Sequence, residues 1–313
     1  KPMETDELYI DEGDFEGPHC KLKHGMQAVI KPLYEQVADH ISLNEQVTKI
    51  TRLGNQKLRI ETNSGLTVDT KCCISTIPLG CLQKLATSLF EPPLSTDTIE
   101  SIRSIATGFY KKVFLTFDNI FWPTNEPLLG LVRSADRADE LGQYLLVYNF
   151  HAKDSIPCLE AVLCGNSGKW SVGRSDTEIR DAVLKFIEDS LGAKDLASKC
   201  VASHVTRWEE DPFTLGTYSS FCLGTLERHI DTLNEPHWDG DLIFAGEFTE
   251  SDQMGSVHAA LMSGERAAAQ AFEILSRKQH LPRSTNERES SPGVVPPQAF
   301  DHVINENATL IFH

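Results

Sequence analysis

The sequence contains no CxxC pair, although it has eight cysteines. Zinc sites and dithiol redox motifs need close cysteine pairs, so we expect reduced thiols within a core and no metal site. No apolar stretch approaches the length of a membrane span, and no signal peptide is visible. These absences favour a soluble protein. They leave its compartment open, with the cytoplasm, the peroxisome or the nucleus preferred to secretion.

Positive charge is scarce as well. The chain has 29 Lys plus Arg against 45 Asp plus Glu, which gives a formal net charge of −16. This balance argues against direct binding of nucleic acid and suits a cationic partner. With 313 residues, the chain can bury one large core or two ordinary domains.

A glycine-rich dinucleotide loop is also missing. Near its N-terminus the sequence has no GxGxxG followed about 20 residues later by an acid, the pattern that cradles the diphosphate of a dinucleotide. Any dinucleotide bound by this chain would need that cradle from elsewhere, either an upstream segment or a second chain.

What is present is a strand, a glycine turn and a helix within residues 241–268. Leu242–Ala245 are apolar and predict a strand covered on both faces. Gly246 allows a ligand to approach the backbone closely, and the small residues after Ser256 allow a helix to pack tightly against a sheet. The positive end of that helix, near Ser256–His258, favours negative charge. The pattern predicts a site for an anionic cofactor.

Other local patterns predict the remaining elements. Ser175-Asp-Thr-Glu178 is a capping box, and Gly192 is a stop signal for the helix that it opens. Helices are also expected over residues 25–40 and 81–105, the latter broken at Pro92-Pro93, and residues 276–298 read as a disordered linker. Strands are expected at Val47–Ile50, Leu58–Thr62, Leu66–Thr70, Cys72–Pro78, Lys112–Phe117, Tyr144–Phe150 and Leu159–Cys164.

Six motifs follow one another along residues 8–275. They are an acidic loop leading to Lys23-His-Gly-Met26, then Ser75–Gly80, Gly108–Phe117, Phe121-Trp122, Arg207-Trp208-x-x-Asp211-Pro212 with Gly216–Ser219, and residues 241–268. In this order they resemble the flavin-containing amine oxidase family, and most of all its polyamine oxidase and lysine demethylase branch. Because the family's diphosphate loop precedes this region, the resemblance covers only the second half of such an enzyme. We therefore expect the chain alone to bind FAD poorly and to be inactive.

The resemblance implies an α/β and α+β fold, in which an incomplete Rossmann-like FAD-binding domain (GR2-type) is interleaved with a mixed-sheet substrate domain. The expected parts are an entrance loop at 1–19, FAD-binding parts at 20–80 and 233–275, a substrate-binding domain at 81–232, and a linker and tail at 276–313.

The resemblance assigns catalysis to Lys112, which would hold a water against flavin N5. The neighbouring Lys111 is expected to point to the other face of the strand. A solvent-facing strand lysine is the alternative. Trp208 would pack beside the flavin, and Tyr218 would form one wall of an aromatic cage for the amine; otherwise both are core aromatics. The second wall, a tyrosine in monoamine oxidases, falls at Ser256, which leaves room for a longer amine.

Further residues are implied to bind FAD. Gly246 and Glu247 would lie near the ribityl and diphosphate groups, with a capping carboxylate as the alternative for Glu247. The Val257 amide would donate to the flavin pyrimidine carbonyl, where the helix dipole stabilises negative charge on reduction. Ser256 is also implied to bind FAD. Val47 would contact adenine through its backbone, and Pro78 would line the cofactor groove.

Three acids at the substrate entrance, Asp11, Glu12 and Asp14, would attract a cationic amine, unless they are merely solvated. The implied reaction is hydride transfer from the carbon beside a neutral amine to flavin N5, followed by imine hydrolysis and reoxidation by O2 to hydrogen peroxide. A polyamine-type substrate is preferred, and a methylated lysine in a peptide is the alternative. An inactive flavin-fold scaffold that binds a partner is the competing hypothesis of another class.

Overall fold

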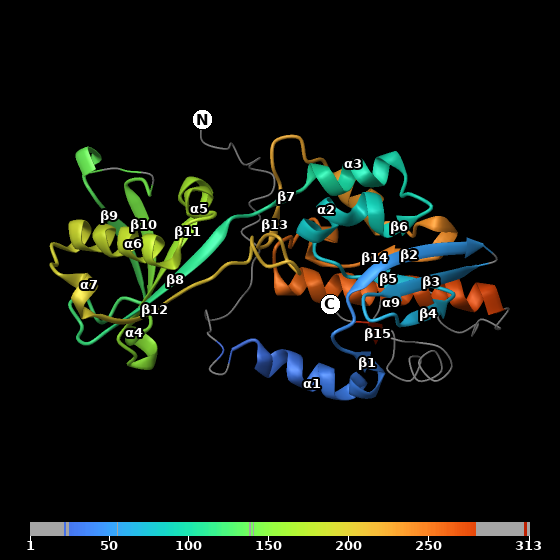
Figure 1. The fold of residues 1–313 in the computed structure, drawn as a ribbon, viewed down its shortest axis with the longest axis horizontal. Helices are drawn as coiled ribbons and strands as arrows, with labels where there is room; N and C mark the ends of the chain where they lie inside the picture. Colours follow the sequence, from blue (N-terminus) through green and yellow to red (C-terminus); the bar gives the residue numbers. More distant parts are fainter. Residues whose placement is uncertain are drawn as a thin grey trace. The chain divides into compact units, whose positions relative to one another are not determined.

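The computed structural model describes Leu22, residues 25–54, 56–137, Asp139, residues 141–279 and Leu310–Ile311. The chain forms two compact units. Unit 1 comprises the described residues up to Ala106 and those from Tyr218 onward, and unit 2 comprises Thr107–Thr217. Figure 1 labels their helices and strands.

Unit 1 contains a four-stranded sheet in the order β4-β3-β2-β6. The first three strands, β2 (Val47–Gly54), β3 (Lys57–Thr62) and β4 (Thr67–Thr70), form an antiparallel meander. The short β6 (Phe90–Glu91) pairs in parallel with β2. Alternate residues of β3 are buried, as expected for a strand with one face toward a core.

A second sheet in unit 1 consists of β5 (Cys73–Ser75) and β14 (Leu242–Phe244), which are parallel. The long helix α9 (Val257–Gln279) packs against them, as Figure 1 shows. Leu242–Phe244 are fully buried, which confirms the prediction of a covered strand. The α9 residues that reach the core are small and four apart, so this face of the helix can approach the sheet closely. They are Ala259, Ser263 and Ala267.

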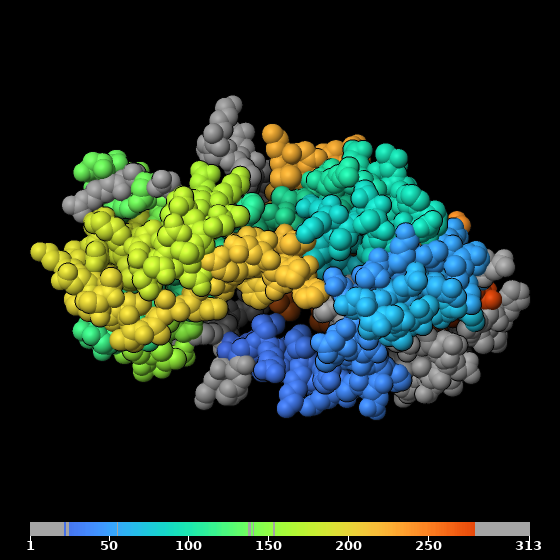
Figure 2. Space-filling model, viewed as in Figure 1, coloured from blue at the N-terminus to red at the C-terminus, as the bar shows by residue number. Residues whose placement is uncertain are grey.

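The other helices of unit 1 are α1, α2, α3 and α8. Ser95 caps α3 by accepting a hydrogen bond from the Thr98 amide. No residue of α1 is buried, and its surface is exposed in dark blue in Figure 2. The bounds are α1 Gln27–Val37, α2 Leu79–Leu89, α3 Thr96–Ser104 and α8 Glu227–Asn234.

Unit 2 is an antiparallel five-stranded sheet in the order β12-β8-β11-β10-β9. One face of the sheet and the helix α6 (Asp176–Leu191) enclose the core, to which Val113, Leu115 and Phe186 contribute. The strands are β8 Tyr110–Phe117, β9 Leu128–Val132, β10 Tyr144–Asn149, β11 Cys158–Cys164 and β12 Cys200–Val205.

The ends of α6 confirm the capping prediction. Ser175 accepts a hydrogen bond from the Glu178 amide, the Glu178 carboxylate accepts one from the Ser175 amide, and Gly192 ends the helix at φ +67°. The short helices of unit 2 are α4 His151–Asp154, α5 Gly165–Ser171 and α7 Leu196–Lys199.

The remaining elements are short. Four are strands, namely β1 Ile41–Ser42, β7 Ala106–Thr107, β13 Ser219–Ser220 and β15 Leu310–Ile311. Four are 3₁₀ turns, at Ala38–His40, Ala135–Arg137, Trp238–Gly240 and Glu247–Thr249. Across the described ranges, no helix is both long enough and apolar enough to cross a membrane.

The mixed α/β architecture and most of the strands agree with the sequence analysis, with three differences. The strand β9 was not predicted. The helix α9 extends to Gln279, so the start of the expected linker is helical. In addition, β15 pairs in parallel with β1, although it lies in the expected tail. The division at 107–217 is narrower than the expected substrate domain at 81–232, whose role stays a prediction.

Candidate functional site

The two adjacent lysines of β8 face opposite sides of the sheet, as predicted. Residues of β8 alternate between buried and half-buried positions, and Lys111 shares the buried row with Val113 and Leu115. Its side chain is 2% exposed and forms an ion pair with Glu209, whose side chain is 8% exposed. The side chain of Lys112, in contrast, is 40% exposed. Of the two, only Lys112 can present its ammonium group to a ligand.

Both the ammonium group and the backbone of Lys112 have fixed partners. Its Nζ lies 3.0 Å from a carboxylate oxygen of Glu160, which is on the neighbouring strand β11. Its amide donates a hydrogen bond of 2.9 Å to the Thr206 hydroxyl, and its carbonyl accepts one of 3.0 Å from the Thr206 amide. The lysine is therefore an ordered cation rather than a free surface side chain.

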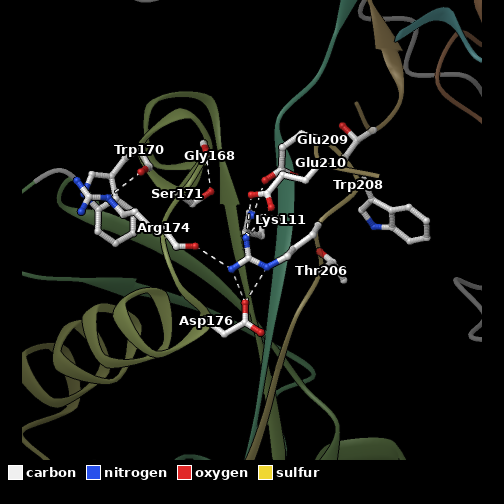
Figure 3. A network of polar contacts seen from close by, with 12 residues as sticks. Lys111, Gly168, Trp170, Ser171, Arg174, Asp176, Thr206, Trp208, Glu209 and Glu210 are labelled. Carbon is white, nitrogen blue, oxygen red and sulfur yellow. Dashed lines mark hydrogen bonds and ion pairs between the residues drawn. The ribbon is translucent and has the colours of Figure 1, made fainter. Parts of the chain in front are cut away.

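Thr206 also begins the segment that carries Trp208. Figure 3 shows the polar contacts around this segment. The Arg207 guanidinium donates from Nε to Asp176 at 2.9 Å, from one terminal nitrogen to the Arg174 carbonyl at 2.7 Å, and from the other to Glu210 at 2.8 Å. The hydrogen bond with Asp176 is the main cause that raises the pKa of Arg207 above its ordinary value. These contacts tie the segment to the start of α6.

Trp208 is fixed by its backbone and presents its ring to the surface of unit 2. Its carbonyl accepts hydrogen bonds from the Thr214 hydroxyl at 2.5 Å and from the Gly216 amide at 3.2 Å. The neighbouring residues are anchored as well, because Arg207 binds Asp176 and Glu209 binds Lys111. The indole is 48% exposed, so within this unit it is not a core aromatic. Its exposure suits a platform for a planar ligand.

In unit 1, Gly246 turns the chain directly after β14. Its φ of +142° lies in a region that favours glycine, and a Cβ there would lie 2.6 Å from a ring carbon of Phe248. Glu247 follows. One of its carboxylate oxygens accepts from the Ser219 amide at 3.1 Å and the Ser219 hydroxyl at 2.7 Å, and the other accepts from the Gly255 amide at 2.7 Å. Glu247 thus fixes the segments on both sides of the turn.

The first turn of α9 is open to a ligand. Ser256 caps the helix, because its hydroxyl accepts a hydrogen bond of 3.1 Å from the Ala259 amide. Val257 is the first residue of this 23-residue helix and is exposed. First-turn amides have no partners within a helix, and the dipole is positive at this end. This end therefore suits an electron-rich group.

Tyr218 lies against the turn before α9. Gly255 has a φ of +82°, and a Cβ at that position would lie 3.0 Å from the Tyr218 ring and 3.1 Å from the Ser219 carbonyl. The tyrosine ring is itself exposed, so it is not a core aromatic within unit 1. The glycine therefore allows the turn to pack closely against Tyr218.

The other predicted site residues are less informative. Val47 begins β2, opposite Thr62, and Pro78 is exposed immediately before α2. Asp11, Glu12 and Asp14 lie outside the described residues. Within the described part of the chain, no group of three or more His, Cys, Asp or Glu side chains comes together as metal ligands do.

The structure thus groups the predicted residues within each unit. Lys112 and Trp208 belong to unit 2, where Thr206 connects them, while Tyr218, Glu247 and Val257 belong to unit 1. Taken unit by unit, their chemistry suits parts of a flavin: unit 2 offers an exposed ring and a cation, and unit 1 offers the amides at the start of a helix. A carboxylate has about four acceptor positions. Glu247 uses three of them for Ser219 and Gly255, which leaves capacity for a cofactor hydroxyl.

Comparison with known proteins identifies the family of the chain. A model of the family described as flavin containing amine oxidoreductase matches residues 7–271. The chain belongs to this family. FAD is the family's cofactor, and the mixed α/β architecture is accordingly that of a flavin amine oxidoreductase.

Several relatives share about a third of the residues. Polyamine oxidase 4 of Oryza sativa subsp. japonica is 30% identical over 300 residues, which cover 94% of this chain and 58% of that protein. Polyamine oxidase 5 of the same rice is 33% identical over 260 residues, covering 83% and 50%. Lysine-specific histone demethylase 1 homolog 3 of Arabidopsis thaliana is 31% identical over 276 residues, covering 86% and 16%. The chain thus spans no more than about three fifths of these relatives.

Solved structures support the same fold. A triple mutant of putrescine oxidase superposes with a TM-score of 0.64 at 22% sequence identity, covering 81% of this chain and 53% of that chain. At this identity the likeness concerns the fold alone.

Sequence reasoning missed the side chains that hold the predicted ones in place. Glu160 is a single acid within the apolar strand Cys158–Cys164, and that mismatch was the available signal. Glu209 lies beside Trp208 within a recognised motif, but its partner Lys111 is far away in the sequence. Thr206 carried no signal of its own.

Proposed function

We propose that this chain forms part of an FAD-dependent amine oxidase that oxidises a carbon–nitrogen bond. The observation that carries the proposal is Lys112, a half-exposed cation held by Glu160 and Thr206 in the same unit as the exposed Trp208. A fixed positive charge is what would stabilise the negative charge that develops when O2 is reduced at a flavin. Family membership supports the same conclusion.

Each residue has a defined task in this proposal. A bound flavin would supply the acceptor for a hydride from the carbon beside a neutral amine, and the electrons that reduce O2 to hydrogen peroxide. Lys112 orients a water and supplies positive charge as O2 is reduced. The Val257 amide and the dipole of α9 stabilise negative charge on the pyrimidine edge of the ring. Trp208 packs beside the ring, and Tyr218 guides the amine toward it.

We propose a polyamine-type secondary amine as substrate, with a methylated lysine in a peptide as the second candidate. Ser256 supports a long amine, because its short side chain caps α9 where a second aromatic wall would narrow the site. The net charge of −16 suits either cation. Both classes occur among the names of the relatives, so the names alone do not decide between them.

We further propose that the cradle for the cofactor diphosphate comes from a segment outside these 313 residues, in cis or on a second chain. The sequence lacks a GxGxxG loop. Unit 1 also presents apolar side chains at its surface that such a segment could cover. On α1 these are Val29, Ile30, Leu33 and Tyr34, and on α9 they are Val257, Leu261, Met262 and Phe272.

Replacing Lys112 with methionine tests the catalytic assignment. In the FAD-loaded product of the full coding sequence, Lys112→Met should slow flavin reoxidation by O2 by about 10²-fold, because the charge that stabilises reduced oxygen is lost. Stopped-flow absorbance of the flavin measures this rate. Lys185→Met is the matched control, since Lys185 is an exposed lysine of α6 in the same unit. Equal rates for Lys112→Met and the control would remove Lys112 from the mechanism.

The substrate class is tested by one peroxide assay on the same product, in which spermine-like amines compete with a dimethyl-lysine peptide. We expect higher kcat/KM for the polyamine, and preference for the peptide would establish the second candidate. A protein that stays colourless with FAD and its upstream segment would contradict the proposal and favour an inactive scaffold.

A further inference from the structure

The strand β11 contains a charged residue that the apolar pattern of its neighbours does not explain. Glu160 lies between Leu159 and Ala161, both fully buried, and its own side chain is only 6% exposed. A carboxylate removed from water costs several kcal/mol unless a cation or several donors compensate for it. Some partner must therefore account for Glu160.

Lys112 is that partner. Glu160 lies opposite Phe114 of β8 and opposite Tyr148 of β10, so two rings flank it along the row. Lys112 is two residues before Phe114 on the same face of the sheet, which makes Glu160 and Lys112 diagonal neighbours on adjacent strands. Their charged atoms are 3.0 Å apart, and among the described residues Glu160 forms an ion pair with Lys112 alone.

The pair is asymmetric. The lysine is 40% exposed, so water can solvate its ammonium group without help from the acid. Glu160, by contrast, depends on Lys112 for compensation. A leucine at position 160 would suit the strand and would leave Lys112 to move through several rotamers. Glu160 therefore lowers the stability of the fold at position 160, and it restricts the side-chain rotamers of Lys112 on the adjacent strand.

We infer that Glu160 is a positioning residue, whose carboxylate holds the Lys112 ammonium group in one place. This inference rests on the proposed function for its catalytic meaning, but the pairing itself concerns two side chains of this chain. Thr206 fixes the backbone of Lys112, and Glu160 fixes the other end of its side chain. Together they convert a flexible lysine into a fixed charge.

The first experiment measures the reactivity of Lys112 without any cofactor. The folded 313-residue chain is treated with a trace of acetic anhydride at one mildly alkaline pH, and the acetylation rate of each lysine is obtained by peptide mass spectrometry. We expect Glu160→Gln to raise the rate at Lys112 by about fivefold, because the side chain is no longer held against a carboxylate and its nitrogen is freer to meet the reagent. Glu160→Asp should restore part of the protection.

Lys185 supplies the matched control within the same digests. It pairs with Asp189, one turn further along α6, at 2.7 Å, so Asp189→Asn should raise the rate at Lys185 and leave Lys112 unchanged. If Glu160→Gln does not fold, all lysines react faster and the comparison rests on Glu160→Asp, whose shorter side chain should give an intermediate increase. An unchanged Lys112 rate in the folded variants would overturn the inference.

The second experiment uses the FAD-loaded product. Glu160→Gln should slow flavin reoxidation by about tenfold, less than Lys112→Met, and leave the KM for the amine unchanged, because the acid acts through the lysine. Glu160→Asp should recover part of the rate. If Lys112→Met has no effect on reoxidation, the proposed function fails, while the acetylation result still decides whether Glu160 holds Lys112. A reoxidation rate unaffected by Glu160→Gln, with Lys112→Met slow, would overturn the positioning role alone.

Discussion

Lys111 and Lys112 are identical in chemistry and adjacent in sequence, yet the structure uses them in opposite ways. Lys111 points into unit 2 and pairs with Glu209, and both side chains are less than 10% exposed. Lys112 points to the other face and pairs with Glu160, and only the acid is buried. A strand places successive side chains on opposite faces, so one residue of offset separates a structural lysine from a candidate catalytic one.

The two pairs also differ in which partner depends on the other. In the buried pair neither charge can reach water, so each needs its partner, and the contact joins β8 to the Trp208 segment. In the half-buried pair, water can solvate the Lys112 ammonium group even when the acid is absent, because the lysine is 40% exposed. In a third pair, Arg207 with Asp176, neither side chain is buried, since both are at least 30% exposed. The three pairs therefore form a series in which the expected cost of breaking the contact falls with exposure.

The largest effect is expected for the buried pair. Lys111→Met leaves the Glu209 carboxylate buried without a cation, and should lower the free energy of unfolding by about 3–5 kcal/mol. Urea unfolding followed by circular dichroism measures this change. The wild-type and variant transitions should differ in midpoint with little change in slope.

The double variant Lys111→Met with Glu209→Met is the control for that prediction. With both charges replaced by apolar side chains, stability should return to within about 1–2 kcal/mol of wild type, because no buried charge is left uncompensated. A double variant as unstable as the single one would mean that packing, rather than charge, explains the cost at position 111.

A smaller stability effect is expected for the half-buried pair. Lys112→Met should lower the free energy of unfolding by about 1–2 kcal/mol. The buried Glu160 loses its cation, but position 112 is 40% exposed, so water can reach the space beside the carboxylate. The same variant should have the larger effect on flavin reoxidation. If Lys111→Met lowered the free energy of unfolding by less than Lys112→Met does, the proposed difference between the two lysines would be wrong.

Local patterns predicted those elements whose signals are local. The capping box at Ser175 and the stop at Gly192 set both ends of α6, and the apolar run Leu242–Ala245 is buried throughout. The strand β9 escaped prediction because it contains Gly130, where a Cβ would lie 3.3 Å from the Tyr144 ring on the next strand. That close packing suits glycine, and it arises from tertiary structure alone.

The end of α9 was underestimated for a similar reason. The apolar pattern fades near Leu275, but Lys278 donates to the buried Asp241 at 2.6 Å and to the Lys71 carbonyl at 3.3 Å, so tertiary contacts accompany the additional turn.

The residues of the candidate site also differ in whether their signal is local or tertiary. Motifs singled out Lys112, Trp208 and Glu247, whereas Glu160 became meaningful only once strand pairing placed it beside Lys112.

The smallest effect is expected at the exposed end of the series. Asp176→Asn keeps an acceptor for Arg207 but removes the charge, and both side chains are at least 30% exposed. The free energy of unfolding should fall by less than about 1 kcal/mol, and the difference should shrink in high salt, which screens exposed pairs and the α6 dipole. Urea unfolding at low and high salt measures both quantities. A loss as large as that of Lys111→Met would show that Arg207 anchors the Trp208 segment as strongly as the buried pair does, and exposure would then no longer rank the three contacts.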